Sequence, residues 1–230
     1  MEEEICPYCH NTMWETYKDE NGVPRAKRCR CYAVKHAKQL LEASGLSDEF
    51  LSKSFDNFDT RGIKQLDNAK KAAQGYVSNF GTVEHTRHNS IMFCGQVGSG
   101  KTHLGVAIAK ALLDRSIPVH YMPYRDAITK LKQVIIDPDE YSRQIQKYTF
   151  PRVLYIDDFL KGKVTESDVN IMYEIINYRY INDLPVILST ERMPADIIGF
   201  DEAIGSRLVE MSSGYVITLT GKELDYRLSA

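Results

Sequence analysis

The sequence predicts an α/β fold, in which helices flank a five-stranded parallel sheet and a small cysteine-containing module precedes the sheet. Five short apolar runs alternate with segments of helical periodicity. This alternation is typical of parallel sheets, whose strands are buried on both faces. Four cysteines in two close pairs lie near the N-terminus, before the first of these runs. We therefore expect two units: the cysteine module with its following helix over residues 1–48, and an α/β domain over residues 49–230.

Composition and charge favour a globular cytoplasmic protein. The 230 residues are 43% hydrophobic, which is enough for a sizeable core, and the net charge of −2 gives the whole chain no strong attraction to nucleic acid. A local basic patch is still compatible with this charge. No apolar stretch has the length that spans a bilayer, and the acidic start of the chain is not a secretory signal. We expect no membrane partner, and cysteines that serve as metal ligands or free thiols.

The N-terminal module is predicted to contain a hairpin and a helix. An Asn-Gly turn signal at residues 21–22 separates segments 12–18 and 25–29, which are expected to pair as strands. Residues 33–43 have helical character, and Gly45 is expected to end that helix because glycine commonly follows a helix C-terminus.

In the second unit, the apolar pattern predicts the order of strands and helices. Short apolar runs predict strands at residues 91–94, 118–122, 153–156, 186–188 and 215–219. Helical spacing predicts helices at residues 64–80, 103–113, 124–136, 140–148 and 167–181, with two short pieces at 194–198 and 201–211. Helical connections between consecutive strands make neighbouring strands parallel.

A glycine-rich segment lies between the first strand of the α/β domain and its following helix. The segment is Gly95-Gln96-Val97-Gly98-Ser99-Gly100-Lys101-Thr102, and it fits the pattern G-x-x-x-x-G-K-[ST]. Glycines allow backbone N–H groups to surround phosphate oxygens, and the start of the helix, which includes His103, adds unpaired N–H groups and a positive dipole end. We expect Lys101 to contact the β- and γ-phosphates of ATP and the Thr102 hydroxyl to coordinate Mg²⁺. A chance glycine-rich turn is the alternative, and the strand and helix around the segment argue against it.

Two carboxylates follow the apolar strand 153–156. A buried strand delivers both acids to the carboxyl edge of the sheet, beside the predicted phosphate loop. We expect Asp157 to hold Mg²⁺ through water, and Asp158 to orient or deprotonate the water that attacks the γ-phosphate. Solvated acids at a strand end are the alternative, and the position after a phosphate loop favours the catalytic interpretation.

Polar residues also follow the strand 186–188. Ser189, Thr190 or Glu191 is a candidate to sense the γ-phosphate during catalysis, and ordinary helix capping by serine or threonine is the alternative. Arg207 lies near the end of a predicted helix. An arginine supplied to a neighbour's γ-phosphate is a known catalytic device, but spacing alone favours a surface arginine. The sequence around Arg227 does not by itself predict a function for this residue.

The cysteine pattern predicts a structural zinc site. The four ligands are expected to be Cys6, Cys9, Cys29 and Cys31. Four thiolates in two close pairs match tetrahedral zinc, and the basic residues around the second pair favour the thiolate form. His10 is a possible substitute ligand, and free thiols or an iron–sulfur cluster are the alternatives. Trp14 and Tyr17 are expected to form the small core of this module rather than a stacking surface for single-stranded nucleic acid.

Together these elements resemble the bacterial and phage helicase loaders of the DnaC/DnaI type, AAA+ ATPases close to the transposition ATPase IstB. The resemblance covers nearly the whole chain. It rests on the cysteine module, Lys53-Ser54-Phe55-Asp56-Asn57-Phe58, the phosphate loop, the acid pair, Gly205-Ser206-Arg207-Leu208 and Asp225-Tyr226-Arg227. It implies that Arg207 is an arginine finger and Arg227 a sensor arginine. Glu191 departs from the asparagine often found in the family, and the helical lid is expected to be reduced or absent.

The resemblance also implies a function. It suggests an ATP-dependent loader that places the replicative hexameric DNA helicase on single-stranded DNA, with ATP, Mg²⁺ and Zn²⁺ as cofactors. The zinc module would bind the helicase, AAA+ modules would self-associate through Arg207, and single-stranded DNA would bind weakly. An IstB-like transposition ATPase that assembles on duplex DNA is one alternative. A non-catalytic nucleotide-binding adaptor is another, and the intact Lys101, Thr102, Asp157 and Asp158 argue against it.

Overall fold

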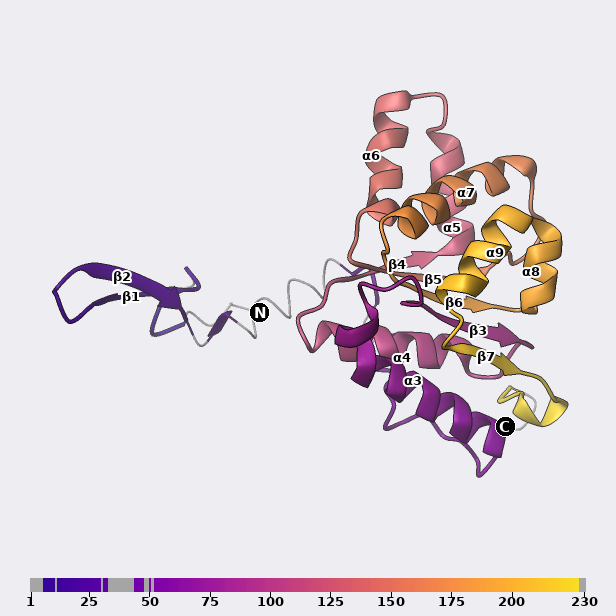
Figure 1. Cartoon of the computed structure of the whole chain (residues 1–230), viewed down its shortest axis with the longest axis horizontal. Helices are drawn as coiled ribbons and strands as arrows, with labels where there is room; N and C mark the ends of the chain where they lie inside the picture. Colours follow the sequence, from indigo (N-terminus) through magenta and orange to yellow (C-terminus); the bar gives the residue numbers. More distant parts are fainter. Residues whose placement is uncertain are drawn as a thin grey trace.

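The computed structural model describes residues 6–10, 12–29, 31–32, 44–47, 50 and 52–227. The predicted helix 33–43 lies outside the described residues. A sheet covered by helices on both faces forms the larger part of the molecule, and a two-stranded hairpin lies apart from it (Figure 1). Within the described part of the chain, no helix is long and apolar enough to cross a membrane.

The five predicted strands form one parallel sheet, as expected. The strands are β3 (Ile91–Gly95), β4 (Val119–Pro123), β5 (Val153–Phe159), β6 (Val186–Thr190) and β7 (Val216–Leu219). Their order across the sheet is β4-β5-β6-β3-β7, and every neighbouring pair is parallel. The carboxyl ends of β3, β5 and β6 therefore meet at one edge, which is where open α/β sheets bind ligands.

Helices cover the sheet in two layers (Figure 1). One layer contains α3 (Lys64–Val83) and α4 (Lys101–Leu113). The other contains α5 (Tyr124–Gln133), α6 (Pro138–Thr149), α7 (Glu166–Ile181), α8 (Pro194–Phe200) and α9 (Glu202–Met211). After β7, the described residues contain the short 3-10 helix η1 (Lys222–Leu224).

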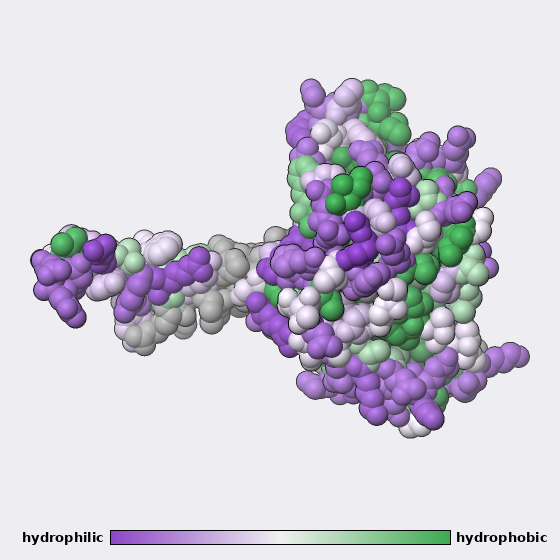
Figure 2. Space-filling view, in the orientation of Figure 1, coloured by the Kyte–Doolittle hydropathy of each residue, from purple (hydrophilic) through white to green (hydrophobic). Residues whose placement is uncertain are grey.

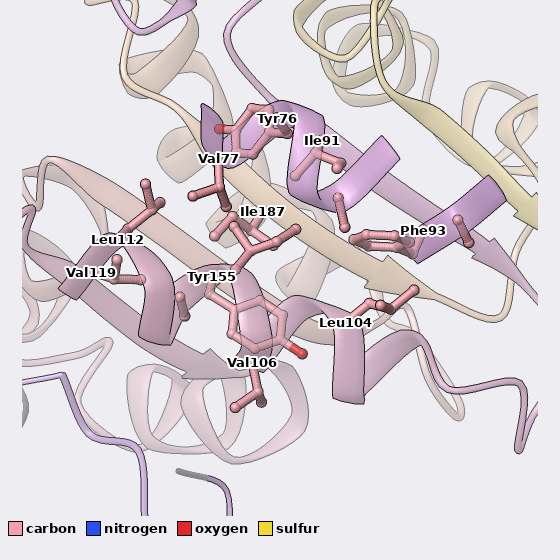
Figure 3. Close-up of a cluster of buried hydrophobic side chains, with 14 of the residues drawn as sticks. Tyr76, Val77, Ile91, Phe93, Leu104, Val106, Leu112, Val119, Tyr155 and Ile187 are labelled. Carbon is pink, nitrogen blue, oxygen red and sulfur yellow. The ribbon is translucent and has the colours of Figure 1, made fainter. Parts of the chain in front are cut away.

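Two hydrophobic cores lie on opposite faces of the sheet because side chains alternate along each strand. In β3, Ile91 and Phe93 belong to the core beneath α3 and α4, whereas Met92 and Cys94 belong to the core beneath α5 to α9. Figure 3 shows the first core, in which Leu104 of α4 lies near Phe93. The central strands β3, β5 and β6 are almost entirely buried on both faces, which explains why they are continuous apolar runs in the sequence.

β5 departs from a regular strand at its carboxyl end. Sequence analysis ended this strand at residue 156, but it continues to Phe159, and its register with β6 shifts between Ile156 and Phe159. Asp158 has φ of 56°, in the left-handed region that non-glycine residues seldom adopt. Such irregularities redirect side chains at a sheet edge. Here the side chains of Asp157 and Asp158 point to different surroundings on either side of the bulge.

Arg179 of α7 is fully buried and ties several loops to the sheet. Its guanidinium donates to the carbonyl oxygens of Thr149 at 3.1 Å, Pro151 at 3.0 Å and Pro185 at 2.7 Å. Burial lowers the pKa of Arg179 to about 9, which still leaves it charged at neutral pH. Carbonyl dipoles rather than a carboxylate therefore stabilise this cation.

The N-terminal hairpin is confirmed in its position and its pairing. β1 (Trp14–Lys18) pairs antiparallel with β2 (Pro24–Arg28), and Trp14 lies opposite Arg28. All five residues of β2 are exposed, and the hairpin is largely hydrophilic in Figure 2. A hairpin with so little apolar burial needs another source of stability.

Candidate nucleotide-binding site

A cavity of about 450 Å³ lies at the carboxyl edge of the sheet, beside the glycine-rich loop. Its walls come from the segment before α3, the glycine-rich loop, the ends of β5 and β6, and the C-terminal segment. The lining residues are Lys53, Asn57, Phe58, Asp59, Val97, Gly98, Ser99, Gly100, Lys101, Thr102, His103, Asp158, Lys161, Glu191, Tyr226 and Arg227. Most of the predicted nucleotide-binding residues therefore line a single cavity.

The glycine-rich loop has the backbone geometry that its sequence predicts. Gly95, Gly98 and Gly100 have φ of 127°, 76° and 85°, which other residues rarely adopt. α4 begins at Lys101, so its unpaired N–H groups and positive dipole end face the cavity. The Lys101 ammonium donates to the carbonyl oxygens of Gly95 at 2.9 Å and Gln96 at 2.5 Å. Burial lowers the pKa of Lys101, opposed by nearby acids.

Thr102 and Asp157 lie side by side, as a shared magnesium site requires. The Thr102 hydroxyl donates to the Asp157 carboxylate at 3.0 Å. Hydroxyl and carboxylate oxygens are the ligands that Mg²⁺ prefers. The residues present therefore fit Mg²⁺, and Asp157 is only 5% exposed, so this position is shielded from bulk solvent.

Asp157 also accepts hydrogen bonds that sequence analysis did not predict. The hydroxyls of Tyr155 at 3.0 Å, Tyr121 at 3.2 Å and Ser189 all donate to its carboxylate. Burial and the Asp157 charge raise the pKa of both tyrosines, which therefore remain donors. These bonds fix the orientation of the carboxylate. Ser189 also accepts a bond of 3.0 Å from the Asp158 N–H, and so joins β6 to β5.

Asp158 has different surroundings from Asp157. Its carboxylate lines the cavity and is 40% exposed, whereas the neighbouring acid does not line it. The Lys161 ammonium lies 2.7 Å from Asp158 and 3.5 Å from Glu191. The two carboxylates therefore differ: Asp157 is buried beside Thr102, and Asp158 is open to the cavity.

Thr190, the last residue of β6, and Glu191, the next residue, have different surroundings. Thr190 is fully buried, does not line the cavity, and donates its hydroxyl to the Phe159 carbonyl at 2.8 Å. Glu191 lines the cavity beside Lys161. Of the three candidates to sense the γ-phosphate, Glu191 is therefore the one that faces the cavity.

The segment before α3 closes one wall of the cavity, and sequence analysis assigned it no contact. The ring of Phe58 packs edge-on against His103, with 5.2 Å between ring centroids. The His103 ring also lies 2.9 Å from the Ser54 carbonyl, and burial lowers its pKa. A Cβ at Gly100 would overlap the Phe58 ring, so glycine is required there for space as well as for φ. Phe58 and the nearby Tyr226 give this wall an aromatic character that suits a nucleotide base.

The two predicted arginines occupy different positions. Arg227 lines the cavity. Arg207 does not: its guanidinium donates to the Ala203 carbonyl at 2.7 Å and lies over the rings of Tyr173 and Tyr180, on the surface formed by α7 and α9. Arg207 is therefore separate from the cavity of its own chain.

The four cysteines of the N-terminal module converge, as predicted. The ligand atoms of Cys6, Cys9, Cys29 and Cys31 all lie within 4.8 Å of one another. Sulfur–sulfur distances are 3.8 Å for Cys6–Cys29 and 3.4 Å for Cys9–Cys31, close to the separation of about 3.8 Å in a tetrahedron of Zn–S bonds of about 2.3 Å. Hydrogen bonds from backbone N–H groups, the one at Tyr8 first, lower the pKa of Cys6 to about 6, whereas burial raises the pKa of Cys29 and Cys31. The donor set fits a zinc ion.

Comparison with known proteins identifies the family. A family model described as IstB-like ATP binding protein matches residues 32–196, which is more than half of the chain. The chain belongs to the IstB-like ATP-binding family. This IstB-like protein is also 35% identical over 218 residues to the phage-like element PBSX protein XkdC of Bacillus subtilis, in an alignment that covers 91% of this chain and 81% of that protein.

Solved structures share the AAA+ fold of this IstB-like protein. The DnaC helicase loader superposes with a TM-score of 0.59 and 22% identity, over 76% of this chain and 100% of that one. DnaI superposes with a TM-score of 0.61 and 19% identity, over 77% of this chain and 93% of that one. At these identities, the likeness establishes the fold and not the partners.

Proposed function

We propose that this protein is an ATP-hydrolysing loader of a ring-shaped replicative DNA helicase. The observation that carries the proposal is that Lys101, Thr102 and Asp158 line one cavity, while the buried Asp157 accepts a hydrogen bond from Thr102. The cysteine module adds support, because all four of its cysteines precede residue 32 and so lie outside the matched IstB-like region. Modules of this kind are a feature of the DnaI-like loaders that the sequence resembles.

The proposed hydrolysis gives each of these residues a role that its position supports. Lys101 leaves the loop carbonyls and contacts the β- and γ-phosphates, and the N–H groups of the loop bind the phosphate oxygens. Thr102 and Asp157 would hold Mg²⁺, which would supply positive charge to neutralise the charge that develops on the phosphates. Asp158 accepts a hydrogen bond, and then the proton, from the attacking water. Arg227 and Glu191 line the same cavity, and we expect them to contact the γ-phosphate.

The position of Arg207 suits a second subunit better than its own. Since Arg207 is separate from the cavity of its chain, its role as an arginine finger requires a neighbouring copy. Its guanidinium makes one hydrogen bond to a backbone carbonyl and stacks on two partly exposed tyrosines. The side chain can exchange these contacts for an ion pair with a phosphate of a neighbouring subunit. ATP-dependent self-association follows from this role.

The test is reconstitution with the replicative helicase of the host. We expect the purified protein to form a complex with the helicase in the presence of ATP and Mg²⁺, and to transfer the ring onto single-stranded DNA. Cys9→Ser is expected to lose the helicase while it retains ATP binding, because the ATP site has its own core. A chain that hydrolyses ATP but neither binds nor transfers the helicase would contradict the proposal.

A transposition role remains the second candidate, because the family match favours it. The matched family model is described as IstB-like, and an insertion-sequence ATP-binding protein of Mycobacterium tuberculosis is 32% identical over 110 residues, which cover 48% of this chain and 43% of that protein. This function predicts ATP-dependent assembly on duplex DNA without any helicase. Light scattering with duplex DNA, ATP and the protein alone distinguishes the two functions.

A further inference from the structure

Three residues between the four cysteines and α3 dock against the outermost strand of the sheet, β4. β5 pairs with one edge of β4. On the other edge, the Tyr121 N–H donates to the Ser44 carbonyl oxygen at 2.7 Å. Ser44 is completely buried, and Leu46 belongs to the same hydrophobic core as Val119 of β4. The ring of Phe50 packs against the same core. We call Ser44, Leu46 and Phe50 the docking residues.

Phe50 extends this contact into a row of aromatic rings. Its ring centroid lies 5.5 Å from that of Tyr121, and the Tyr121 centroid lies 5.3 Å from that of Tyr155. Tilted ring pairs of this kind attract each other beyond the area that they bury. Phe50 does not line the nucleotide cavity, so its effect on that site passes through its neighbours. The docking residues therefore hold Tyr121 both by its main chain and by its ring.

The Tyr121 hydroxyl reaches one particular oxygen of Asp157. The hydroxyls of Thr102, Tyr155 and Ser189 donate to the Oδ1 atom of Asp157. Tyr121 donates to the other oxygen, Oδ2, at 3.2 Å. Hydrogen bonds to both oxygens limit rotation of the carboxylate, and Tyr121 supplies the bond on the second side. Loss of such a partner of a metal-binding carboxylate typically lowers metal affinity or activity by about 10- to 100-fold.

We propose that the docking residues regulate the magnesium site: their contact with β4 holds Tyr121 against Asp157, and binding of Mg²⁺ with ATP in turn tightens that contact. This regulation rests on the proposed ATPase function and acts on the same site. Tyr121 bonds the docking residues through its N–H and the carboxylate through its hydroxyl, so thermodynamic linkage makes the two effects reciprocal. A partner that binds the cysteine module and shifts the docking residues therefore changes the affinity for Mg²⁺. Loss of the hairpin alone should leave the contact intact, because Leu46 is part of the core of the α/β domain.

Tyr121→Phe tests the bond to the carboxylate, because it removes the hydroxyl and keeps the ring contacts. The Mg²⁺ concentration for half-maximal ATP turnover should rise about ten-fold, while turnover at saturating Mg²⁺ stays within about two-fold of the wild type. Titration calorimetry should show the same loss in Mg²⁺-dependent ATP affinity and no change in ATP affinity in EDTA. Tyr141→Phe is the matched control, because its hydroxyl donates to Glu174 at 2.8 Å and does not line the cavity. An unchanged Mg²⁺ requirement in Tyr121→Phe overturns the inference.

Phe50→Ala tests the docking residues themselves. Although Phe50 does not line the cavity, its removal should raise the Mg²⁺ requirement about five-fold, and Phe50→Leu, which keeps an apolar side chain in the core, should act in the same direction. Phe150→Ala removes an exposed ring elsewhere and should match the wild type. If both Phe50 variants have the wild-type Mg²⁺ requirement, the docking residues do not regulate the site.

A double variant tests the route between the two positions. Phe50→Ala/Tyr121→Phe should have the same Mg²⁺ requirement as Tyr121→Phe alone, because the Phe50 ring acts through the Tyr121 hydroxyl. Effects of the two substitutions that multiply would show that Phe50 acts by another route, and would overturn the inference.

Hydrogen exchange tests the reverse direction and needs no turnover. The Tyr121 amide should exchange about five-fold more slowly with Mg²⁺ and ATP than with ATP in EDTA, because the bound metal tightens the contact with Ser44. In Tyr121→Phe this difference should disappear. Equal exchange in the wild type with and without Mg²⁺ shows that the linkage does not exist. If the wild type binds Mg²⁺ and ATP but never hydrolyses ATP, the proposed ATPase function fails, whereas calorimetry and exchange still decide the regulation.

Discussion

Asp157 and Asp158 are neighbours in the sequence but differ in almost every physical respect. Asp157 is buried and accepts hydrogen bonds from four hydroxyls, those of Thr102, Tyr121, Tyr155 and Ser189. Asp158 is partly exposed and faces a lysine. The first environment holds the carboxylate in one orientation, as a metal ligand requires. The second allows access of water and a change of partner, as a base requires.

At the residue scale, Lys101→Ala should weaken ATP binding by roughly 100-fold, because the variant loses charge-assisted hydrogen bonds to two phosphates. Isothermal titration with Mg²⁺ and ATP measures the affinity. Lys71→Ala, which removes an exposed cation from α3, is the matched control and should bind as the wild type does. Equal affinity of Lys101→Ala and the wild type would rule out the assigned phosphate site.

Asp158→Asn should separate binding from catalysis. We expect ATP affinity within about two-fold of the wild type and a turnover lowered by about 10²–10⁴, the usual contribution of a general base. Asp157→Asn should instead lose the dependence of ATP binding on Mg²⁺. Titration calorimetry at several Mg²⁺ concentrations, together with steady-state turnover, measures both effects. If Asp158→Asn loses Mg²⁺-dependent binding and Asp157→Asn does not, the two roles are reversed.

The sequence indicated the candidate site through local patterns, and the residues it missed come from distant segments. The glycine-rich loop and the acid pair are contiguous in the chain, so their spacing was informative. Tyr121 reaches Asp157 only because β4 pairs with β5, and Phe58 reaches His103 only through packing of the segment before α3. Such contacts depend on tertiary structure, and a single sequence has no local signal for them.

At the scale of elements, strand and helix order followed from apolar periodicity because both faces of the sheet are buried. The order of strands across the sheet was not predicted. The strand order depends on how the helix that connects each pair of strands packs against the sheet. In this protein β3 lies between β6 and β7, which are distant from it in the sequence. The extension of β5 through its bulge was also missed, because Asp157 and Asp158 interrupt the apolar pattern.

The buried arginine of α7 should be important for stability. Arg179→Met should lower the free energy of unfolding by about 3 kcal/mol, because several buried carbonyl groups lose their hydrogen-bond donor. Urea denaturation monitored by circular dichroism measures the change. Arg143→Met on α6, where the side chain is 71% exposed, is the control and should change stability by less than about 0.5 kcal/mol. Equal stability of the two variants would show that the carbonyl network contributes little.

The hairpin should depend on metal. We expect one zinc ion per chain in protein purified without chelator, and Cys9→Ser should lose zinc and the structure of β1 and β2. ATP binding should be unchanged, since the α/β domain has its own core. Cys94→Ala, which alters a cysteine of β3 outside the cluster, is the control and should keep its zinc. Elemental analysis that finds no metal in the wild-type protein would contradict this prediction.

At the scale of the whole molecule, the proposed role of Arg207 as an arginine finger requires a neighbouring copy, because Arg207 does not line the cavity of its own chain. Arg207→Ala has an intact nucleotide cavity, and Lys101→Ala has an intact finger. Each variant alone should lose about 10³-fold or more of the ATP turnover. A mixture of the two should recover part of it, because the finger of one copy meets the ATP of another. No recovery, with assembly confirmed by light scattering, would place the action of Arg207 within its own chain.

The glycine-rich loop is joined to segments from both ends of the α/β domain. The Tyr226 N–H donates to the Gly98 carbonyl at 3.0 Å, the Tyr226 hydroxyl donates to the Asp59 carbonyl, and the Gln96 side chain bonds to Gly221 at 2.5 Å and 3.1 Å. Hydrogen bonds therefore link the glycine-rich loop to the C-terminal segment, and that segment to the segment before α3. By thermodynamic linkage, a change at either end of the domain that alters these bonds also alters the affinity of the loop for nucleotide. A protein that binds either end of the domain and shifts these bonds therefore changes the affinity for ATP without contacting a phosphate.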